Sequence, residues 1–208
     1  MKRSLLLAIA ALALSISASA GNGDDFGSWT ALNLKAGITD KLKAQLWFEM
    51  RTKDKLTSID CFNIFPSLSY NLLPFLEIGV GAEFVDAQVR KDIGFRPYAT
   101  LNLSSEALSF SLREMPFIEI YNDGTPTSYS LRSSVKVSYS IPSTRISPYL
   151  NIEVFSKKHW DKTRHYAGVV FGFGKRSSLD LYYMYYTFAD KDFQRHLIGV
   201  AYNITLFD

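Results

Sequence analysis

The chain has 208 residues, 47% of them hydrophobic and 14% aromatic, and a formal net charge of +3. This length suits one domain. The balanced charge gives no reason to expect nucleic acid as a partner, because nucleic-acid binding needs concentrated Lys and Arg. Cys61 is the only cysteine, which excludes a disulfide within the chain.

Residues 1–20 have the features of a cleaved export signal. Lys2 and Arg3 provide a basic start, an apolar run follows from Leu5 to Ile16, and Ala18-Ser19-Ala20 resembles a cleavage site. The apolar run has about a dozen residues, whereas a membrane-spanning helix needs roughly 20. We therefore expect an exported protein that starts at residue 21, with its formal charge lowered from +3 to +1 by the loss of two basic residues.

Alternating apolar and polar residues predict strands along the first half of the chain, because successive strand side chains point to opposite faces. The period is most regular from Leu42 to Met50. It also predicts a strand before this segment, over 29–37, and others after it, over 62–70, 76–84 and 96–103. Pro66 interrupts the strand over 62–70, which predicts a bulge or an edge there.

The second half of the chain continues the same pattern. It predicts strands over 108–113, 131–139, 146–154, 167–174, 179–188 and 196–207. The period is lost between Glu114 and Tyr121. The resulting count is eleven, whereas single-chain bacterial barrels normally have an even number. Either one strand is missed or split in this count, near Glu114–Tyr121 or before Trp29, or the N-terminus takes an unusual path.

The connections between these strands alternate in length. Short turns are expected at 39–40, 104–105, 142–143 and 176–177, and longer charged loops at 51–58, 86–92, 156–163 and 189–194. Outer-membrane barrels have short periplasmic turns and longer outer loops. The sequence therefore predicts one all-β domain over 21–208, an antiparallel transmembrane β-barrel of 10–12 strands in the lipids of the bacterial outer membrane. A soluble β-sandwich is the alternative, but its strands are typically five or six residues long.

Charged residues of both signs recur on the polar face of these strands. The candidates to line the lumen are Glu49, Arg51, Glu77, Glu83, Arg96, Arg113, Lys136 and Glu153. Charges in a narrow lumen need partners, so one hypothesis is a paired network that stiffens the barrel. The other is a charge-lined path for small solutes. Gly79, Gly81, Gly172 and Gly174 would leave room for large inward side chains or relieve crowding.

Aromatic residues gather near strand ends, as expected for an interfacial girdle. Trp160 and Tyr166 form one such group, and Tyr182, Tyr183, Tyr185, Tyr186 and Phe188 form another. Because the second group occupies both parities of one strand, some of its tyrosines must face the lumen.

Two further functions remain as hypotheses. A lipid-modifying enzyme would pair His165 or His196 with a serine at the membrane-facing rim, although no serine has a diagnostic spacing. A surface-binding module would act through its outer loops, notably Ser156–Thr163. We predict no catalytic residue, metal or cofactor, and the oligomeric state stays open.

Four short motifs together resemble a family of outer-membrane barrels classified only as a domain of unknown function. The motifs are Trp29 at the first strand, Glu49-Met50-Arg51, Arg96-Pro97-Tyr98, and His196 to Tyr202. The resemblance spans Trp29 to Phe207. It implies an outer-membrane barrel without established catalytic or binding residues, in which Trp29, Glu49, Arg51 and Arg96 form a structural signature.

Overall fold

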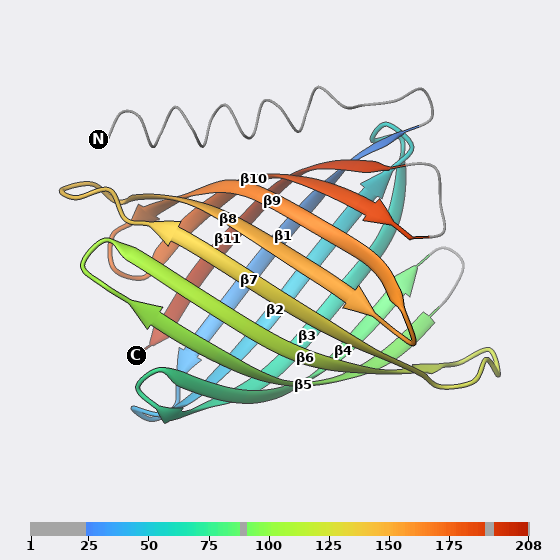
Figure 1. The fold of residues 1–208 in the computed structure, drawn as a ribbon, viewed down its shortest axis with the longest axis horizontal. Helices are drawn as coiled ribbons and strands as arrows, with labels where there is room; N and C mark the ends of the chain where they lie inside the picture. Colours follow the sequence, from blue (N-terminus) through green and yellow to red (C-terminus); the bar gives the residue numbers. More distant parts are fainter. Residues whose placement is uncertain (1–23, 88–90, 190–193, 208) are drawn as a thin grey trace.

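The computed structural model describes residues 24–87, 91–189 and 194–207, and these form one closed β-barrel (Figure 1). Its strands are β1 (Asp25–Gly37), β2 (Leu42–Lys53), β3 (Ser58–Leu73), β4 (Leu76–Ala87), β5 (Lys91–Ser104), β6 (Leu108–Tyr121), β7 (Ser128–Tyr139), β8 (Ile146–Ser156), β9 (Trp160–Phe173), β10 (Ser177–Phe188) and β11 (Arg195–Phe207). The expected signal peptide lies outside the described residues. A closed barrel rules out the sandwich alternative. The described residues include no helix of a length and hydropathy suited to crossing a membrane.

The eleven expected strands are the eleven observed in the described part of the chain, and their odd number decides how the barrel closes. Consecutive strands pair antiparallel, so the first and last strands of an odd set run in the same direction. β1 accordingly pairs with β11 in parallel, from Asp25 opposite Arg195 onwards. The expected all-antiparallel barrel is thus wrong at this one seam.

Two local expectations are also wrong. The stretch from Glu114 to Tyr121, where the period is lost, belongs to one long strand, β6. Pro66 lies inside β3, opposite Leu46 of β2, and the closed barrel leaves β3 no free edge. The β3–β4 pairing skips Phe65 and Pro66, but its register is the same on both sides, so no bulge forms there.

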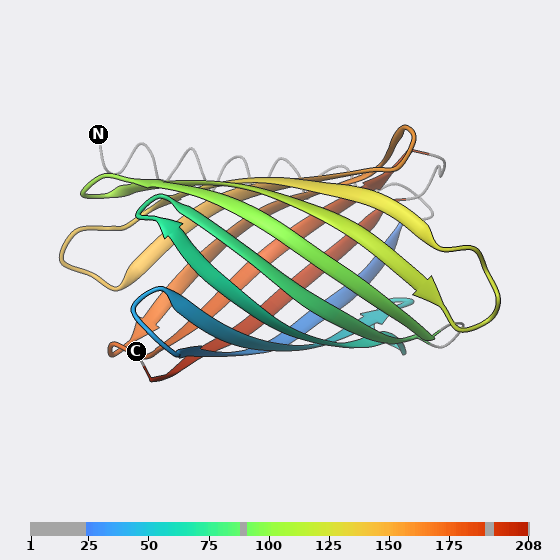
Figure 2. The same cartoon turned by 90° about the horizontal axis from the view of Figure 1, so that it is seen from below.

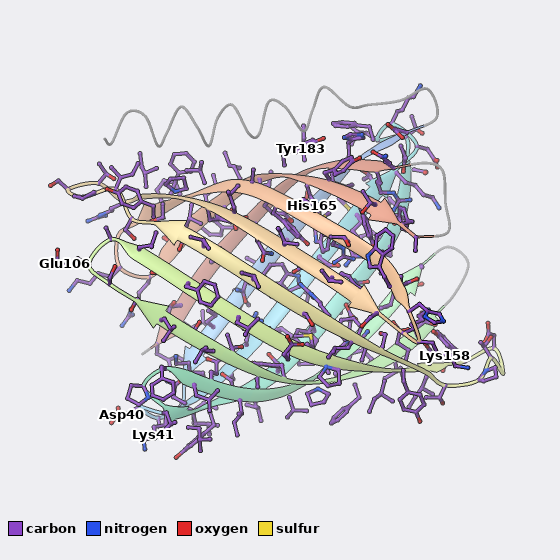
Figure 3. All side chains as sticks on the ribbon, in the orientation of Figure 1. Asp40, Lys41, Glu106, Lys158, His165 and Tyr183 are labelled. Carbon is purple, nitrogen blue, oxygen red and sulfur yellow. The ribbon has the colours of Figure 1, made fainter. Side chains whose placement is uncertain are left out.

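The chain enters and leaves the barrel at opposite ends. The N-terminal rim is the end where β1 begins, and it carries the connections 54–57, 122–127 and 157–159; the C-terminal rim, where β11 ends, carries 38–41, 74–75, 105–107, 140–145 and 174–176. Figure 3 shows Asp40, Lys41 and Glu106 at one end and Lys158 at the other. The strands extend into the segments expected to be long loops, so the described connections at the two rims have similar lengths.

The outer wall of the barrel is predominantly apolar, with the hydrogen-bonded Glu114 and Ser133 as a polar pair on it. Large hydrophobic side chains are exposed on every described strand except β2, where they are partly exposed; examples are Leu32 of β1, Val80 of β4 and Val200 of β11. The polar members of the same strands, such as Asn33 and Arg96, are 2% and 3% exposed and point into the barrel. The two-residue period therefore separates an apolar exterior from a charged interior, and the strands tilt across the barrel (Figure 2).

Candidate functional site: the barrel lumen

The lumen has two parts that differ in how they are filled. The closed half, toward the N-terminal rim, is filled by a network around Glu49, Glu83 and Glu153. The vestibule is the remaining part, and it reaches the C-terminal rim at Lys175 and Arg176 of the β9–β10 turn. One cavity of about 760 Å³ extends from the closed half through the vestibule.

Glu49 of β2 and Glu83 of β4 organise one side of the closed half. Glu49 accepts hydrogen bonds from the indole of Trp29 at 2.7 Å and from that of Trp47 at 2.9 Å, and it pairs with Arg51. Asn63 donates to Glu49 at 2.5 Å and approaches Glu83 at 3.3 Å, which joins the two carboxylates. Glu83 in turn accepts from Nε and Nη2 of Arg96, at 3.1 and 2.5 Å.

Glu153 of β8 organises the opposite side. Its carboxylate pairs with Arg132 of β7 and with Arg164 of β9, whose Nη1 lies 3.4 Å away. The hydroxyl of Tyr166 donates to Glu153 at 2.9 Å, and Arg164 donates to the hydroxyl of Tyr186 at 3.3 Å. Each strand from β7 to β10 therefore supplies at least one member of this cluster, which fixes the register of four neighbouring strands from the inside.

Trp29 joins the two sides. The guanidinium of Arg51 lies 3.8 Å from the centre of its ring and that of Arg164 lies 5.0 Å away, as cation–π contacts. Trp29 also packs against Met184 and Leu197, which are 0% and 2% exposed. Because buried side chains reach this level from strands around the barrel, the closed half has the packing of a core rather than a pore.

Three tyrosines lie flat on the lumen wall, two in the vestibule and Tyr182 at its boundary with the closed half, where Tyr182 packs against the cluster of Trp29, Met184 and Leu197. Tyr98, Tyr149 and Tyr182 stand opposite Gly79, Gly168 and Gly199 on the neighbouring strands. An added Cβ at Gly199 would come within 2.0 Å of the Tyr182 ring, and one at Gly79 within 2.2 Å of the Tyr98 ring. The glycines thus let the rings cover the backbone instead of crossing the lumen, which is the room expected for Gly79.

Cations lie on the exposed faces of two of these rings. Arg113 lies 4.7 Å from the centre of the Tyr98 ring, and Nζ of Lys136 lies 3.8 Å from that of Tyr149. The hydroxyl of Tyr149 donates to Asp180 at 3.1 Å. The wall of the vestibule is therefore built from repeated layers of glycine, tyrosine and a basic side chain.

Of the eight residues expected to line the lumen, Glu77 does not contact this cavity. It lies 3.8 Å from Arg113 instead. The others line the cavity: Glu49, Arg51, Glu83, Arg96, Arg113, Lys136 and Glu153. Sequence reasoning did not include Arg132 and Arg164, the partners of Glu153. Arg132 follows the alternation of its strand, but Arg164 lies between Thr163 and His165, where no apolar period indicates its direction. The pairing of both arginines depends on the register between strands.

The tyrosines of β10 alternate between the lumen and the outer wall, as expected for successive residues of a strand. Tyr182 and Tyr186 face the lumen, where they contact Tyr166 and Arg164. Tyr183 and Tyr185 lie on the outer wall, where both rings contact His196. The expected place of Tyr166 in an interfacial girdle is wrong, because its hydroxyl binds Glu153 inside the barrel.

The histidines lie on or beyond the outer wall. Nδ1 of His196 shares a hydrogen bond with the hydroxyl of Tyr183, and Nε2 of His196 lies 3.4 Å from Oδ2 of Asp24. Within the described residues, no hydrogen bond joins a serine to His165 or His196, so the geometry suggested for a lipid-modifying enzyme does not occur there. The described residues also contain no cluster of His, Cys, Asp and Glu suited to a metal ion.

A second cavity lies at the N-terminal rim, beside the β8–β9 loop. It has a volume of about 690 Å³ and is lined by Tyr129, Lys157, Lys158, His159, Trp160, Asp161 and Ala189. It includes part of the loop Ser156–Thr163 that the sequence suggests as a binding surface. Tyr129 is 68% exposed there and Trp160 is 49% exposed.

Comparison with known proteins places the chain in a family whose role is not established. No curated protein and no solved structure gives a significant match. The model of a family described as a protein of unknown function, DUF2490, matches residues 26–196. This match spans β1 to the first residues of β11, including the whole closed half of the lumen apart from Leu197. The chain therefore belongs to the DUF2490 family.

Proposed function

We propose that the protein is a barrel of the bacterial outer membrane and acts as a normally closed channel for small solutes. The observation that carries this proposal is the pairing of a predominantly apolar outer wall with a charged lumen. A soluble monomer rarely exposes apolar patches beyond a few hundred Å². Here large aliphatic and aromatic side chains are exposed on ten of the eleven described strands and partly exposed on β2, and lipid is the environment that suits such a surface.

Strand length supports the same placement. A tilted transmembrane strand needs about 9–11 residues, and the strands here have 11 to 16. The export signal expected in residues 1–20 would bring the chain to the periplasm. In our proposal the barrel has the orientation expected from the sequence, with the connections around 51–58 and 156–163 facing outward. The C-terminal rim accordingly faces the periplasm, and the vestibule opens toward the periplasm.

The charged composition of the closed half supports a gate that can open the lumen rather than a permanently packed core. Buried ion pairs stabilise a protein less than apolar packing of similar volume, because both charges lose their hydration. A barrel with only a structural role could fill this level with aliphatic side chains. The network around Glu49, Glu83 and Glu153 instead consists of groups that water can solvate once they separate, which suits a barrier that opens.

Planar-bilayer recording of the purified barrel tests this function. We expect the wild-type protein to stay mostly closed with rare conductance steps, and Glu153→Gln to open more often because Arg132 and Arg164 lose their shared partner. Glu83→Gln is the second gate variant, and Glu106→Gln, in an exposed turn, is the control. Heat-dependent gel mobility establishes that each variant is folded. If the wild type and both folded gate variants never conduct, the channel is refuted and a structural barrel remains. If the gate variants open no more often than a conducting wild type, the gate is refuted.

A further inference from the structure

The vestibule contains a concentration of positive charge that the balanced composition of the whole chain conceals. Nine basic and four acidic side chains line the cavity. Three of the acids, Glu49, Glu83 and Glu153, belong to the closed half, where each is paired with an arginine. Asp180 is the acid that remains in the vestibule lining. The basic residues that line the vestibule are Lys35, Arg113, Lys136, Lys175 and Arg176.

The three innermost cations of the vestibule have little neutralisation from the protein. The nearest carboxylate oxygen to Arg113 is that of Glu77 at 3.8 Å, which is too long for a hydrogen bond. Nε of Arg113 donates to the uncharged hydroxyl of Thr100 at 2.8 Å. Within the described part of the chain, Lys35 and Lys136 have no carboxylate at ion-pair distance. Their charges are therefore available to a ligand.

These cations approach the middle of the lumen from opposite walls. Lys35 comes from β1, whereas Arg113 and Lys136 come from β6 and β7, which lie across a ring of eleven strands from β1. The charge of Lys35 is close enough to interact with those of Arg113, Lys136 and Glu77, and the charge of Lys136 interacts with that of Asp180. A solute in the middle would consequently have basic groups on both sides.

We propose that the vestibule is a binding site for a soluble phosphate-bearing solute with two or more negative charges. The planar fork of Arg113 suits two oxygens of such a group, and the two lysines provide further charge-assisted hydrogen bonds. The cavity to which the vestibule belongs has a volume of about 760 Å³ in all, which falls within the usual range of small-molecule sites. Only the side from which the solute enters rests on the proposed function, because that side depends on the orientation of the barrel in the membrane. Binding itself does not require conduction.

Isothermal titration of the detergent-solubilised barrel with pyrophosphate tests the site. We compare the wild type with a Lys35→Gln/Lys136→Gln variant and with a matched Lys41→Gln/Lys55→Gln control, whose lysines are exposed in connections outside the cavity. Figure 3 shows Lys41 at one end of the barrel. Charged hydrogen bonds of this kind account for about tenfold in affinity each. We expect the cavity variant to weaken binding at least about tenfold and the control to change it less than about twofold. Equal affinities in all three proteins, or no binding to the wild type, would refute the site.

The same three proteins separate this inference from the channel. Pyrophosphate binding by a folded barrel that never conducts would uphold the site and refute the channel. Conductance that prefers cations and is not blocked by pyrophosphate would uphold the channel and refute the site. The expected result is conductance that prefers anions in the wild type, with this preference reduced in the Lys35→Gln/Lys136→Gln variant and retained in the control.

Discussion

The closed half and the vestibule are built from the same strands with the same parity, yet one is filled and the other is open. In the closed half, each of the three carboxylates, Glu49, Glu83 and Glu153, forms an ion pair with an arginine. Trp29 makes cation–π contacts with two guanidinium groups. In the vestibule, glycine faces tyrosine, and the basic side chains outnumber the acids. The difference shows that the identity of the inward residue, and not the size of the barrel, decides whether the lumen is closed at a given level.

Loss of Glu153 should have the largest effect on stability. Glu153 is 4% exposed and pairs with Arg132 and Arg164, so Glu153→Gln leaves the buried Arg164 and the partly buried Arg132 without their counter-charge. Breaking a buried ion pair typically costs about 3–5 kcal/mol. Urea unfolding in lipid vesicles should show a loss of this order. The exposed control Glu106→Gln should stay within about 0.5 kcal/mol. Equal stability of the two variants would mean that the network does not hold the closed half.

A methyl group at Gly199 should have the next largest effect. Its Cβ would lie 2.0 Å from the Tyr182 ring, so the ring must swing off the wall and into the lumen. Forcing extra volume into packed structure costs about 1–3 kcal/mol. Gly172→Ala is the matched control, because the nearest atom to its added Cβ, in Arg145, would be 3.3 Å away, against 2.0 Å at Gly199. If both variants unfold at the same urea concentration, the tyrosine does not need its glycine.

Replacing Glu114 should have the smallest effect on stability, and it tests whether the outer wall faces lipid. It lies in the middle of β6, faces outward and accepts a hydrogen bond from Ser133 at 2.6 Å. A charge on the lipid face of a barrel is destabilising, less so for acids than for basic residues. Glu114→Leu should therefore raise the free energy of unfolding in vesicles by about 1 kcal/mol. A decrease in stability would place this part of the wall in water or against another protein.

The fold could be largely predicted because the two-residue period is a local property of the sequence. Alternation placed all eleven strands, including the apolar and polar faces of Leu42–Met50. The parallel closure of β1 on β11 could not be predicted, because it depends on the total number of strands. The loop lengths were also wrong, because charged residues such as Lys53 and Lys91 continue the strands instead of ending them.

The site was less accessible to sequence reasoning than the fold. Parity identified inward charges such as Glu49 and Arg96, but it does not show which charges meet. The cluster of Arg132, Arg164 and Tyr166 around Glu153 depends on the register of four strands. Trp29 was noted only as part of a short motif, because an indole can equally face lipid. The excess of cations in the vestibule emerges only once the acids are assigned to the closed half.

The most direct test of the two-part lumen and the lipid-facing wall is a nitroxide scan of β7 in vesicles. Single cysteines from 131 to 138 are labelled in a Cys61→Ser background, and collisions with oxygen and with a water-soluble nickel chelate are measured. We expect Leu131, Val135 and Val137 to favour oxygen, Ser134 and Lys136 to favour the chelate, and Arg132 in the closed half to be shielded from both. Chelate access at the odd positions, or equal access at Arg132 and Lys136, would contradict this structure of the lumen and its wall.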